Sequence, residues 1–381
     1  MERVRYGIVG TGGMGTGHAH SIQEIEECEL SAVCDIVPEV AQEVGETFDV
    51  PYFVDYHDLV DYGEVDAVIV ATPHYFHPSI SIYAMKSGKP VISEKPIAVA
   101  VSGADAMVKV AQRTGVPFAV MHQTRTAPIW RAAGELVEAG HLGELYRTML
   151  VFSTFRSQAY YDSAGWRATW GGEGGGVLIN QAPHSLDRFT WLGGLPSKVT
   201  ALTMTKNHDI EVEDVATAML EYPDGAVGYL YCSTTEAPTT EIMELAGEKG
   251  KLRVVGDEIR FWELPEGVKA FSDASEDMWG HPPDEEIDVP IPDCESGHSA
   301  VLRNVARHIL YGEELLTPGV DGRKSVEIIN AVILSGHTGE PVEIPVDRDR
   351  YDAFLEKMKE TSSFDEEDRG PDKRVTDTVH H

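Results

Sequence analysis

Cysteine and long apolar runs are scarce in this sequence. Only four of the 381 residues are cysteine, and Cys28, Cys34, Cys232 and Cys294 show neither a C-x-x-C pair nor zinc-finger spacing. We therefore expect reduced thiols in a cytoplasmic protein. No run approaches 18 apolar residues, and the first residues lack an apolar signal segment. Both observations argue against a transmembrane helix and against export.

Basic residues are also few, since 31 Lys and Arg stand against 63 Asp and Glu, for a net charge of −32. Such a chain repels phosphates, so we expect neither nucleic acid nor an anionic membrane as partner. An acidic, lysine-poor surface also suits concentrated salt, which screens self-repulsion. A halophilic source is therefore a hypothesis.

The first third of the chain alternates short apolar runs with helical patterns. Several runs are apolar without alternation, as in strands that are buried on both faces. Strands that alternate with helices predict a doubly wound parallel sheet. The predicted strands are 4–9, 30–34, 67–71, 90–93 and 117–121, and the predicted helices are 14–26, 40–48, 57–61, 78–87 and 103–114.

After about residue 125, longer alternating runs replace this pattern. They predict an antiparallel sheet with helices on one face, and a turn signal at 223–225 predicts a hairpin. We expect strands at 143–155, 197–205, 214–221, 225–234, 241–246, 251–255 and 258–263. We expect helices at 129–139, 178–192, 300–311 and 323–335, the last two covering this sheet.

The pattern is that of an α/β protein with two domains. We predict a dinucleotide-binding Rossmann domain over 1–123 and a second domain over 124–361. The stretch 263–296 holds eleven acidic residues and five prolines, which is typical of a loop. Residues 362–381 predict a flexible acidic tail.

The strongest local signal is a G-x-G-x-x-G motif between a predicted strand and a predicted helix. Its first glycine permits a tight turn, its second lets the backbone approach a pyrophosphate, and its third lets the helix lie close to the sheet. The pyrophosphate would lie at the positive end of that helix. We expect cofactor contacts from the whole loop, Gly10, Thr11, Gly12, Gly13, Met14 and Gly15.

Asp35 follows the second predicted strand. A carboxylate at this position accepts hydrogen bonds from the adenosine ribose and repels a 2′-phosphate. Residues 36–38 offer no arginine to bind such a phosphate. We therefore favour NAD over NADP as the cofactor.

Polar residues also follow the strands at 67–71 and 90–93. The ends of parallel strands form the ligand crevice of an open α/β sheet. A lysine there can hold an alcohol or carbonyl oxygen, although a solvated surface lysine is the alternative. The histidines have no carboxylate partner in sequence, so we expect no metal. The residues are Thr72, Pro73, His74, His77, Glu94 and Lys95.

A further polar cluster lies within the predicted helix 178–192. Asn180, His184 and Asp187 are spaced by four and three residues, so at about 100° per residue they would share one helix face. A histidine with polar neighbours suits proton transfer near neutral pH, and a structural histidine is the alternative.

These motifs resemble the Gfo/Idh/MocA family of oxidoreductases over about residues 4–345. The resemblance rests on the glycine loop, Asp35, Thr72-Pro73 with His77, Glu94-Lys95-Pro96, Trp166-Arg167, the glycine run before Asn180, His184 with Leu186-Asp187, and Asp321-Gly322-Arg323. It implies a Rossmann domain and a C-terminal α/β domain with an open, mostly antiparallel sheet. That second domain would bind substrate and form a homodimer or homotetramer through its sheet.

The resemblance also implies roles for single residues. Lys95 and His184 would face the nicotinamide, and Trp166 and Arg167 would lie near the cofactor. Substrates would be sugars or cyclitols. Two positions depart from the family pattern, because Asn180 stands where many relatives carry Asp and His74 stands where relatives often carry Asn.

Together these observations predict an NAD-dependent dehydrogenase that oxidises a secondary alcohol of a sugar, anhydrosugar or cyclitol. An amide cannot take up a proton, so His184 would be the general base, with Lys95 stabilising the alkoxide and Asn180 holding a hydroxyl. Asp187 would orient the substrate or His184, or anchor its helix. Two alternatives remain: a glycosidase that oxidises a sugar carbon transiently with bound NAD, and a non-catalytic sugar or dinucleotide sensor.

Aromatic faces pack on a pyranose ring, and amides bind its hydroxyls. Gln123 is a further candidate for contact with the cofactor. The candidate substrate contacts are Lys95, Arg125, Tyr160, Tyr161, Trp166, Asn180, Gln181 and His184.

Overall fold

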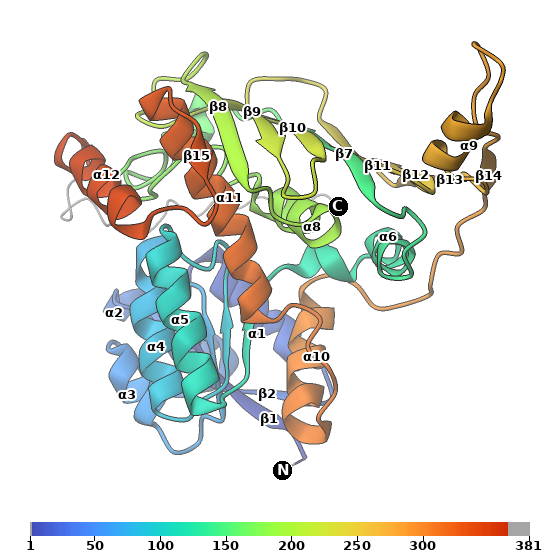
Figure 1. Cartoon of the computed structure of the whole chain (residues 1–381). Coiled ribbons are helices and arrows are strands. Elements are labelled where there is room, and N and C mark those ends of the chain that lie inside the picture. The colour runs from blue at the N-terminus through green and yellow to red at the C-terminus, as the bar shows by residue number, and fades with distance from the viewer. Residues whose placement is uncertain (1, 365–381) are drawn as a thin grey trace.

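The computed structural model describes residues 2–364, so most of the predicted tail 362–381 lies outside the described residues. Two sheets organise the described chain. One has six strands in the order β3-β2-β1-β4-β5-β6, and the other has nine in the order β14-β13-β12-β11-β7-β10-β9-β8-β15. In Figure 1 the first sheet lies below the second, and the long helix α11 runs alongside both.

The six-stranded sheet is the predicted doubly wound parallel sheet, and all of its strand pairs are parallel. Its order reverses between β1 and β4, where such sheets bind ligands at the carboxyl ends of the strands. The two-residue β3 was not predicted, because so short a strand has no measurable periodicity. The strands are β1 Val4–Val9, β2 Cys28–Cys34, β3 Tyr52–Phe53, β4 Ala67–Val70, β5 Val91–Ser93 and β6 Phe118–Val120.

Helices pack on this sheet because each has one apolar stripe. In α5, for example, Ala104, Met107 and Val108 are buried, and the helix ends where Gly115 adopts the left-handed conformation at φ 70°. The helices are α1 Gly13–Gln23, α2 Pro38–Phe48, α3 Tyr56–Asp61, α4 His77–Lys86 and α5 Val101–Thr114, with 3₁₀ turns at His74–Phe76 and Gln123–Thr126.

The nine-stranded sheet is antiparallel except where β10 pairs in parallel with β7. The predicted hairpin turn joins β9 to β10, with Gly225 at φ 90°. The strands are β7 Leu145–Ser153, β8 Lys198–Met204, β9 Val215–Glu221, β10 Val227–Ser233, β11 Thr240–Gly247, β12 Gly250–Val255, β13 Glu258–Glu263, β14 Glu285–Ile287 and β15 Val342–Glu343.

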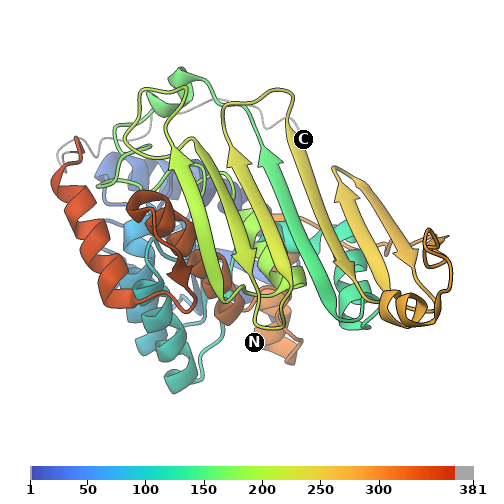
Figure 2. The same cartoon turned by 45° about the horizontal axis from the view of Figure 1, so that its top comes forward.

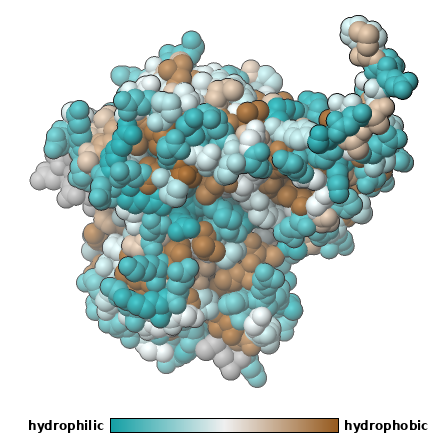
Figure 3. All heavy atoms as spheres, in the orientation of Figure 1, coloured by the Kyte–Doolittle hydropathy of each residue, from teal (hydrophilic) through white to brown (hydrophobic). Residues whose placement is uncertain are grey.

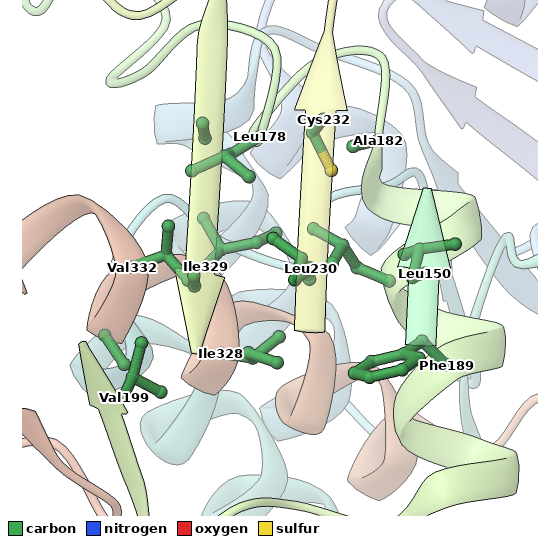
Figure 4. Packing of buried hydrophobic residues seen from close by; sticks show 14 of the residues in the cluster. Leu150, Leu178, Ala182, Phe189, Val199, Leu230, Cys232, Ile328, Ile329 and Val332 are labelled. Atoms are coloured by element: carbon green, nitrogen blue, oxygen red, sulfur yellow. The ribbon is translucent and has the colours of Figure 1, made fainter. Parts of the chain in front are cut away.

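Within residues 2–364, helices cover only one face of this second sheet, and Figure 2 shows the strands of the other face without a covering helix from this part of the chain. The covering helices are α6 Pro128–Glu138, α8 Pro183–Gly193 and part of α11 Gly319–Thr338. Figure 4 shows the core between these layers, where Leu230 of the sheet lies near Phe189 of α8 and Ile329 of α11. All three side chains are fully buried. The packing fixes α8 against the sheet, and α8 carries part of the site described below.

The helix predicted at 300–311 forms as α10 His298–Tyr311, but the prediction that it covers the second sheet is wrong. It packs on the first sheet, and the hydroxyl of Tyr6 in β1 donates to the carbonyl of Leu302 at 3.3 Å. Periodicity identifies the buried face of a helix but not the surface that it meets. α11 contacts both β6 and β8, so only part of the predicted cover is confirmed.

The acidic stretch 263–296 was predicted as a loop, yet it contains α9 Val268–Ala274 and the edge strand β14. It projects from the end of the second sheet in Figures 1 and 3. Within this stretch, Met278 and Trp279 are each 86% exposed. The helix buries no residue, so its sequence lacks the apolar stripe on which prediction depends.

Two late elements were also not predicted, β15 and α12 Arg348–Glu360. The strand has two residues, and α12 buries only Tyr351 and Leu355. Both therefore carry a weak periodic signal. The short helix α7 Gln158–Tyr161 escaped prediction for the same reason.

Candidate active site

The glycine loop lies between β1 and α1. A Cβ atom on Gly10 would lie 2.7 Å from the backbone of Ala71, and one on Gly15 would lie 1.9 Å from the carbonyl oxygen of Gly10. By contrast, Cβ atoms on Gly12 and Gly13 would meet nothing within 4 Å. The loop is therefore closely packed on the sheet side and open on the other side, as a pyrophosphate site requires.

The N-terminus of α1 keeps its amide groups available for an anion. Its N-cap is Gly12, no side chain of residues 2–364 caps it, and its first turn holds no acidic residue. Asp35 lies beside the loop, where it accepts hydrogen bonds from the Thr11 N–H at 2.9 Å and the Thr11 hydroxyl at 3.1 Å. It also accepts one from the Val37 N–H at 3.0 Å. A carboxylate has about four acceptor positions, so capacity for a ribose hydroxyl remains.

The two predicted histidines after β4 take different positions. Nε2 of His77 lies 2.7 Å from the Thr72 carbonyl and its Nδ1 lies 2.8 Å from the Pro96 carbonyl. The chain itself therefore occupies both ring nitrogens, and His77 braces the turns after β4 and β5. His74 lies nearer the candidate cofactor residues, with its ring centre 6.2 Å from that of Trp166. Burial, then the charges of His77 and Lys95, holds the pKa of His74 well below its usual value.

Glu94 and Lys95 lie at the carboxyl end of β5. Nε2 of His18 in α1 lies 2.7 Å from one Glu94 oxygen, and the Lys95 N–H donates to the other at 3.1 Å. Burial favours the neutral acid, but the hydrogen bond and charge of His18 outweigh it and hold the pKa of Glu94 at about 2. Nζ of Lys95 donates to the backbone carbonyl of Asn180 at 3.0 Å. Burial lowers the pKa of Lys95, although Glu94 and Glu173 oppose this shift.

The prediction that one helix carries Asn180, His184 and Asp187 is wrong for Asn180. The helix α8 begins at Pro183, which has no N–H to donate and suits a first helical position, so Asn180 lies in the preceding turn. Nε2 of His184 lies 3.4 Å from the amide nitrogen of Gln123, which follows β6. The site thus joins residues from both sheets.

Asp187 and Arg125 do not face the open side of the site. The guanidinium of Arg125 donates two hydrogen bonds to Asp187, at 2.6 and 2.7 Å, and a third to Asp321 at 3.0 Å. Arg125 is 3% exposed and Asp187 is fully buried. The predicted substrate residue Arg125 is therefore engaged by carboxylates of the chain, and Asp187 anchors its helix.

The aromatic candidates also separate into two groups. Nε2 of Gln181 and the guanidinium of Arg167 both donate to the Tyr160 hydroxyl, at 3.2 and 3.1 Å. The same guanidinium lies 4.6 Å from the centre of the Trp166 ring. The predicted substrate residue Tyr161 is instead buried, and its hydroxyl pairs with Thr234 at 2.7 Å.

Unpaired polar atoms gather at the centre of the site. A buried polar atom without a partner costs about 1–3 kcal/mol, and such atoms are typical where a ligand completes the hydrogen bonding. Five of these atoms belong to residues that the sequence had singled out, and two more belong to His122, so the site fits a nicotinamide dinucleotide and a hydroxyl-rich substrate. The seven atoms, which have no hydrogen-bond partner among residues 2–364, are Thr72 Oγ1, His74 Nδ1, His122 Nδ1 and Nε2, Gln123 Oε1, Gln181 Oε1 and His184 Nδ1.

Two residues of this site were missed from the sequence. His122 is 1% exposed, its ring centre lies 6.0 Å from that of His184, and its Nε2 lies 3.5 Å from Asp187. Burial lowers its pKa to about 4. Glu173 hydrogen-bonds to Asn180. The only available signals were the place of His122 after a strand and of Glu173 before the glycine run.

Over residues 2–364, no group of three or more His, Cys, Asp or Glu is arranged to hold a metal ion. Within the same range, no helix has the length and apolar character to cross a membrane.

Comparisons with known proteins agree with this architecture. Residues 4–122 match the family model "Oxidoreductase family, NAD-binding Rossmann fold", and residues 130–253 match the GFO/IDH/MocA C-terminal domain. The WlbA dehydrogenase of Chromobacterium violaceum, solved with NADH and UDP-GlcNAcA, is 30% identical with a TM-score of 0.78, and the match covers 91% of this chain and 97% of that one.

Two curated relatives are similar at lower identity. The D-apiose dehydrogenase of Paraburkholderia graminis is 26% identical over 90% of each chain. The inositol 2-dehydrogenase of Rubrobacter xylanophilus is 27% identical over 66% of this chain and 72% of the relative. With the glycine loop, the two sheets and these matches, the chain belongs to the GFO/IDH/MocA family of oxidoreductases, whose N-terminal domain is an NAD-binding Rossmann fold.

Proposed function

We propose that this chain is an NAD-dependent dehydrogenase that oxidises a secondary alcohol of a sugar, anhydrosugar or cyclitol. The observation that carries the proposal is a meeting of residues from the two halves of the chain. Lys95, at the end of β5, donates to the Asn180 carbonyl, and the amide nitrogen of Gln123, after β6, lies 3.4 Å from Nε2 of His184. The polyhydroxylated compounds in the names of the relatives support the substrate class.

When bound, NAD supplies a ring that accepts a hydride. The glycine loop and Asp35 would hold its pyrophosphate and ribose, and Thr72, His74 and Gln123 would line its nicotinamide end. Trp166 and Arg167 would lie over the same end. Together these residues would orient the nicotinamide relative to the alcohol carbon.

His184 accepts the hydroxyl proton in this proposal. Burial, then the charges of Lys95 and His122, holds its pKa well below the usual value, so the ring is neutral and able to take a proton at pH 7. One of the three N–H groups of the Lys95 ammonium donates to the Asn180 carbonyl. The other two remain for the substrate oxygen as it becomes an alkoxide.

The specificity of the site would come from the second domain. Gln181 and Asn180 offer amides for hydroxyl groups, and Trp166 and Tyr160 offer aromatic faces for a sugar ring. We do not assign a substrate contact to Tyr161 or Arg125, because both are buried and paired with other residues of the chain.

The cofactor preference is tested at Asp35. In Asp35→Asn, we expect kcat/KM with NAD, divided by kcat/KM with NADP, to fall by at least about tenfold. The variant removes the carboxylate that would repel the 2′-phosphate of NADP, and a change of about 1.4 kcal/mol corresponds to a factor of ten. Coenzyme kinetics at fixed substrate measure this ratio. Glu39→Gln, which neutralises an exposed carboxylate nearby, is the matched control. An unchanged ratio in Asp35→Asn would remove Asp35 from the cofactor site.

A screen of aldoses, anhydrosugars and inositols with NAD and NADP, followed by the absorbance of the reduced coenzyme, tests the function. We expect net reduction of NAD by at least one class. The rate should fall by at least about 10²–10³-fold in Lys95→Met, since that variant loses the ammonium that would stabilise the alkoxide. Cleavage of a glycoside without net reduction would indicate the glycosidase alternative. Binding without either reaction would indicate a sensor.

We also propose that the chain assembles as a homodimer or homotetramer through the uncovered face of the second sheet (Figure 2). Leu202, Met219 and Val227 of that sheet are each at least half exposed, which favours a partner surface. Sedimentation of the full chain tests this, and a monomer of 41.8 kDa at micromolar concentration would contradict it. We place the protein in the cytoplasm, a location that its four free cysteines support.

A further inference from the structure

Glu173 is a buried carboxylate that the mechanism above does not use. It is 1% exposed and directly precedes the glycine run. Its Oε2 accepts the Ala168 N–H at 2.7 Å, and its Oε1 accepts the side-chain amide of Asn180. Asn180 in turn accepts the ammonium of Lys95 on its backbone carbonyl at 3.0 Å. The carboxylate is therefore one residue away from the charged group of the site.

The two hydrogen bonds of Glu173 join two separate segments. Ala168 adopts the left-handed conformation at φ 51°, which is unfavourable for a residue with a side chain. The bond from its N–H to Glu173 stabilises this turn, and Trp166 and Arg167 come directly before it. The other bond holds the loop that carries Asn180.

Because Nδ2 of Asn180 is turned towards Glu173, Oδ1 is the atom left for a substrate hydroxyl. Only a group with two acceptor oxygens can receive both donors in this way. Glutamine has one acceptor oxygen and one NH₂ group. The Ala168 N–H can only donate, so a glutamine at position 173 would turn its single oxygen towards Ala168. Its NH₂ group would then face the Asn180 amide, which would have to turn over to accept from it.

Glu173 lies near two cationic groups, Lys95 after β5 and Arg167 before it in the chain. The other titratable groups that face it are His74 after β4, Tyr161 of α7 and the acid Glu213 before β9. Burial raises the pKa of Glu173 to about 7, although the hydrogen bonds of Ala168 and Asn180 and the charges of Arg167 and Lys95 oppose the shift. Its charge therefore changes near neutral pH.

We propose that Glu173 is a positioning residue whose carboxylate fixes the amide of Asn180 and, together with Glu94, supplies the negative charge that keeps Lys95 an ammonium. The effect on turnover rests on the proposed function, whereas the effect on Lys95 does not. The effect of Glu173 on the protonation of Lys95 can thus be tested without substrate or cofactor.

The first test measures Lys95 by brief acetylation of the full chain across a pH series, with mass spectrometry of its peptide. A neutral amine reacts and an ammonium does not, so the pH of half-maximal labelling follows the pKa of Lys95. We expect Glu173→Gln to lower that pH by about one, since the Glu173 charge raises the pKa of Lys95 and the loss of a close opposite charge shifts a pKa by about 1–3. The double variant Glu173→Gln/Asn180→Asp restores a carboxylate beside Lys95, so the pH of half-maximal labelling should return towards the wild-type value.

Glu213→Gln is the matched control. Glu213 is also buried, and burial raises its pKa to about 7, but it accepts hydrogen bonds from Gly176 and Leu178 rather than from Asn180. It should move the labelling of Lys95 less than Glu173→Gln does. Equal shifts in the two variants, or no shift in Glu173→Gln while its thermal unfolding stays normal, would overturn the proposal.

The second test is the pH profile of kcat/KM with a substrate from the screen. Wild type should lose activity as the pH falls and Glu173 is protonated. Glu173→Gln stays neutral at every pH, so its kcat/KM should be about tenfold lower than that of wild type at pH 8 and should not fall further as the pH falls. In Glu173→Asp, kcat/KM should still fall with the pH. Profiles of equal shape and height would overturn the proposed effect on turnover. A correct shift in Lys95 labelling without any oxidised substrate would instead reject the proposed function and leave the role of Glu173 intact.

Discussion

Replacement of His184 by alanine should lower kcat by about 10²–10⁴-fold, the usual contribution of a positioned general base. The residue lies on α8 and approaches Gln123, while the glycine loop and Asp35 lie on the other sheet. Binding of NADH, measured by fluorescence, should therefore stay within about threefold of wild type. Stopped-flow or steady-state measurement of NAD reduction gives the rate.

The control for this variant is His281→Ala, because His281 lies exposed in the projecting segment 263–296. It should leave both rate and binding unchanged. Turnover of His184→Ala within threefold of wild type would reject the assigned role. A loss of NADH binding equal to the loss of rate would instead make His184 a cofactor contact.

The pH response separates His184 from its neighbours. Because its pKa is lowered, His184 stays neutral as the pH falls below the usual histidine value of about 6.5, and only more acidic solution removes the base. A loss of activity near pH 7 would therefore come from another group. Burial raises the pKa of Glu173 to about 7, and Glu173 hydrogen-bonds to Asn180 of the site.

Replacement of Asp187 by asparagine should destabilise the protein by about 3–5 kcal/mol, the usual cost of breaking a buried ion pair. The isosteric amide leaves the Arg125 guanidinium, which is 3% exposed, with Asp321 as its remaining carboxylate. The pair also joins the turn after β6 to the helix that carries His184. Urea-induced unfolding measures the loss.

Two further variants make this test specific. Asp321→Asn removes a partly exposed partner of the same arginine and should cost about 1 kcal/mol or less. Replacing both buried partners, Arg125→Met with Asp187→Leu, should recover part of the stability, since no uncompensated charge remains. A loss below 1 kcal/mol in Asp187→Asn would show that the buried pair contributes little.

Periodicity predicted most elements but not their partners. The buried strands of the first sheet and the alternating strands of the second can be predicted from the sequence, because the apolar pattern of a strand depends on which of its faces are buried. The apolar stripe of α10 is visible too, yet it packs on the first sheet instead of the second. Many surfaces offer equal apolar burial, so the stripe alone cannot select one.

Candidate residues divide in the same way. Asn180 and His184 were correctly placed close together in the chain, but Pro183 begins the helix between them, and only the folded turn gives Asn180 its contacts with Lys95 and Glu173. Arg125 looks like a substrate residue in sequence because nothing there shows its carboxylate. Asp187 lies 62 positions away, and the fold alone brings the two together.

By itself, the sequence determined the glycine loop, the acidic residue after β2 and the parallel sheet, because these are local: they depend on φ angles, residue spacing and burial within a few neighbours. The scarcity of cysteine, basic residues and long apolar runs likewise led to predictions from composition alone. The tertiary structure decided which charges are paired. Pairing sets whether a buried group faces a ligand or a partner, and it depends on residues far apart in the chain.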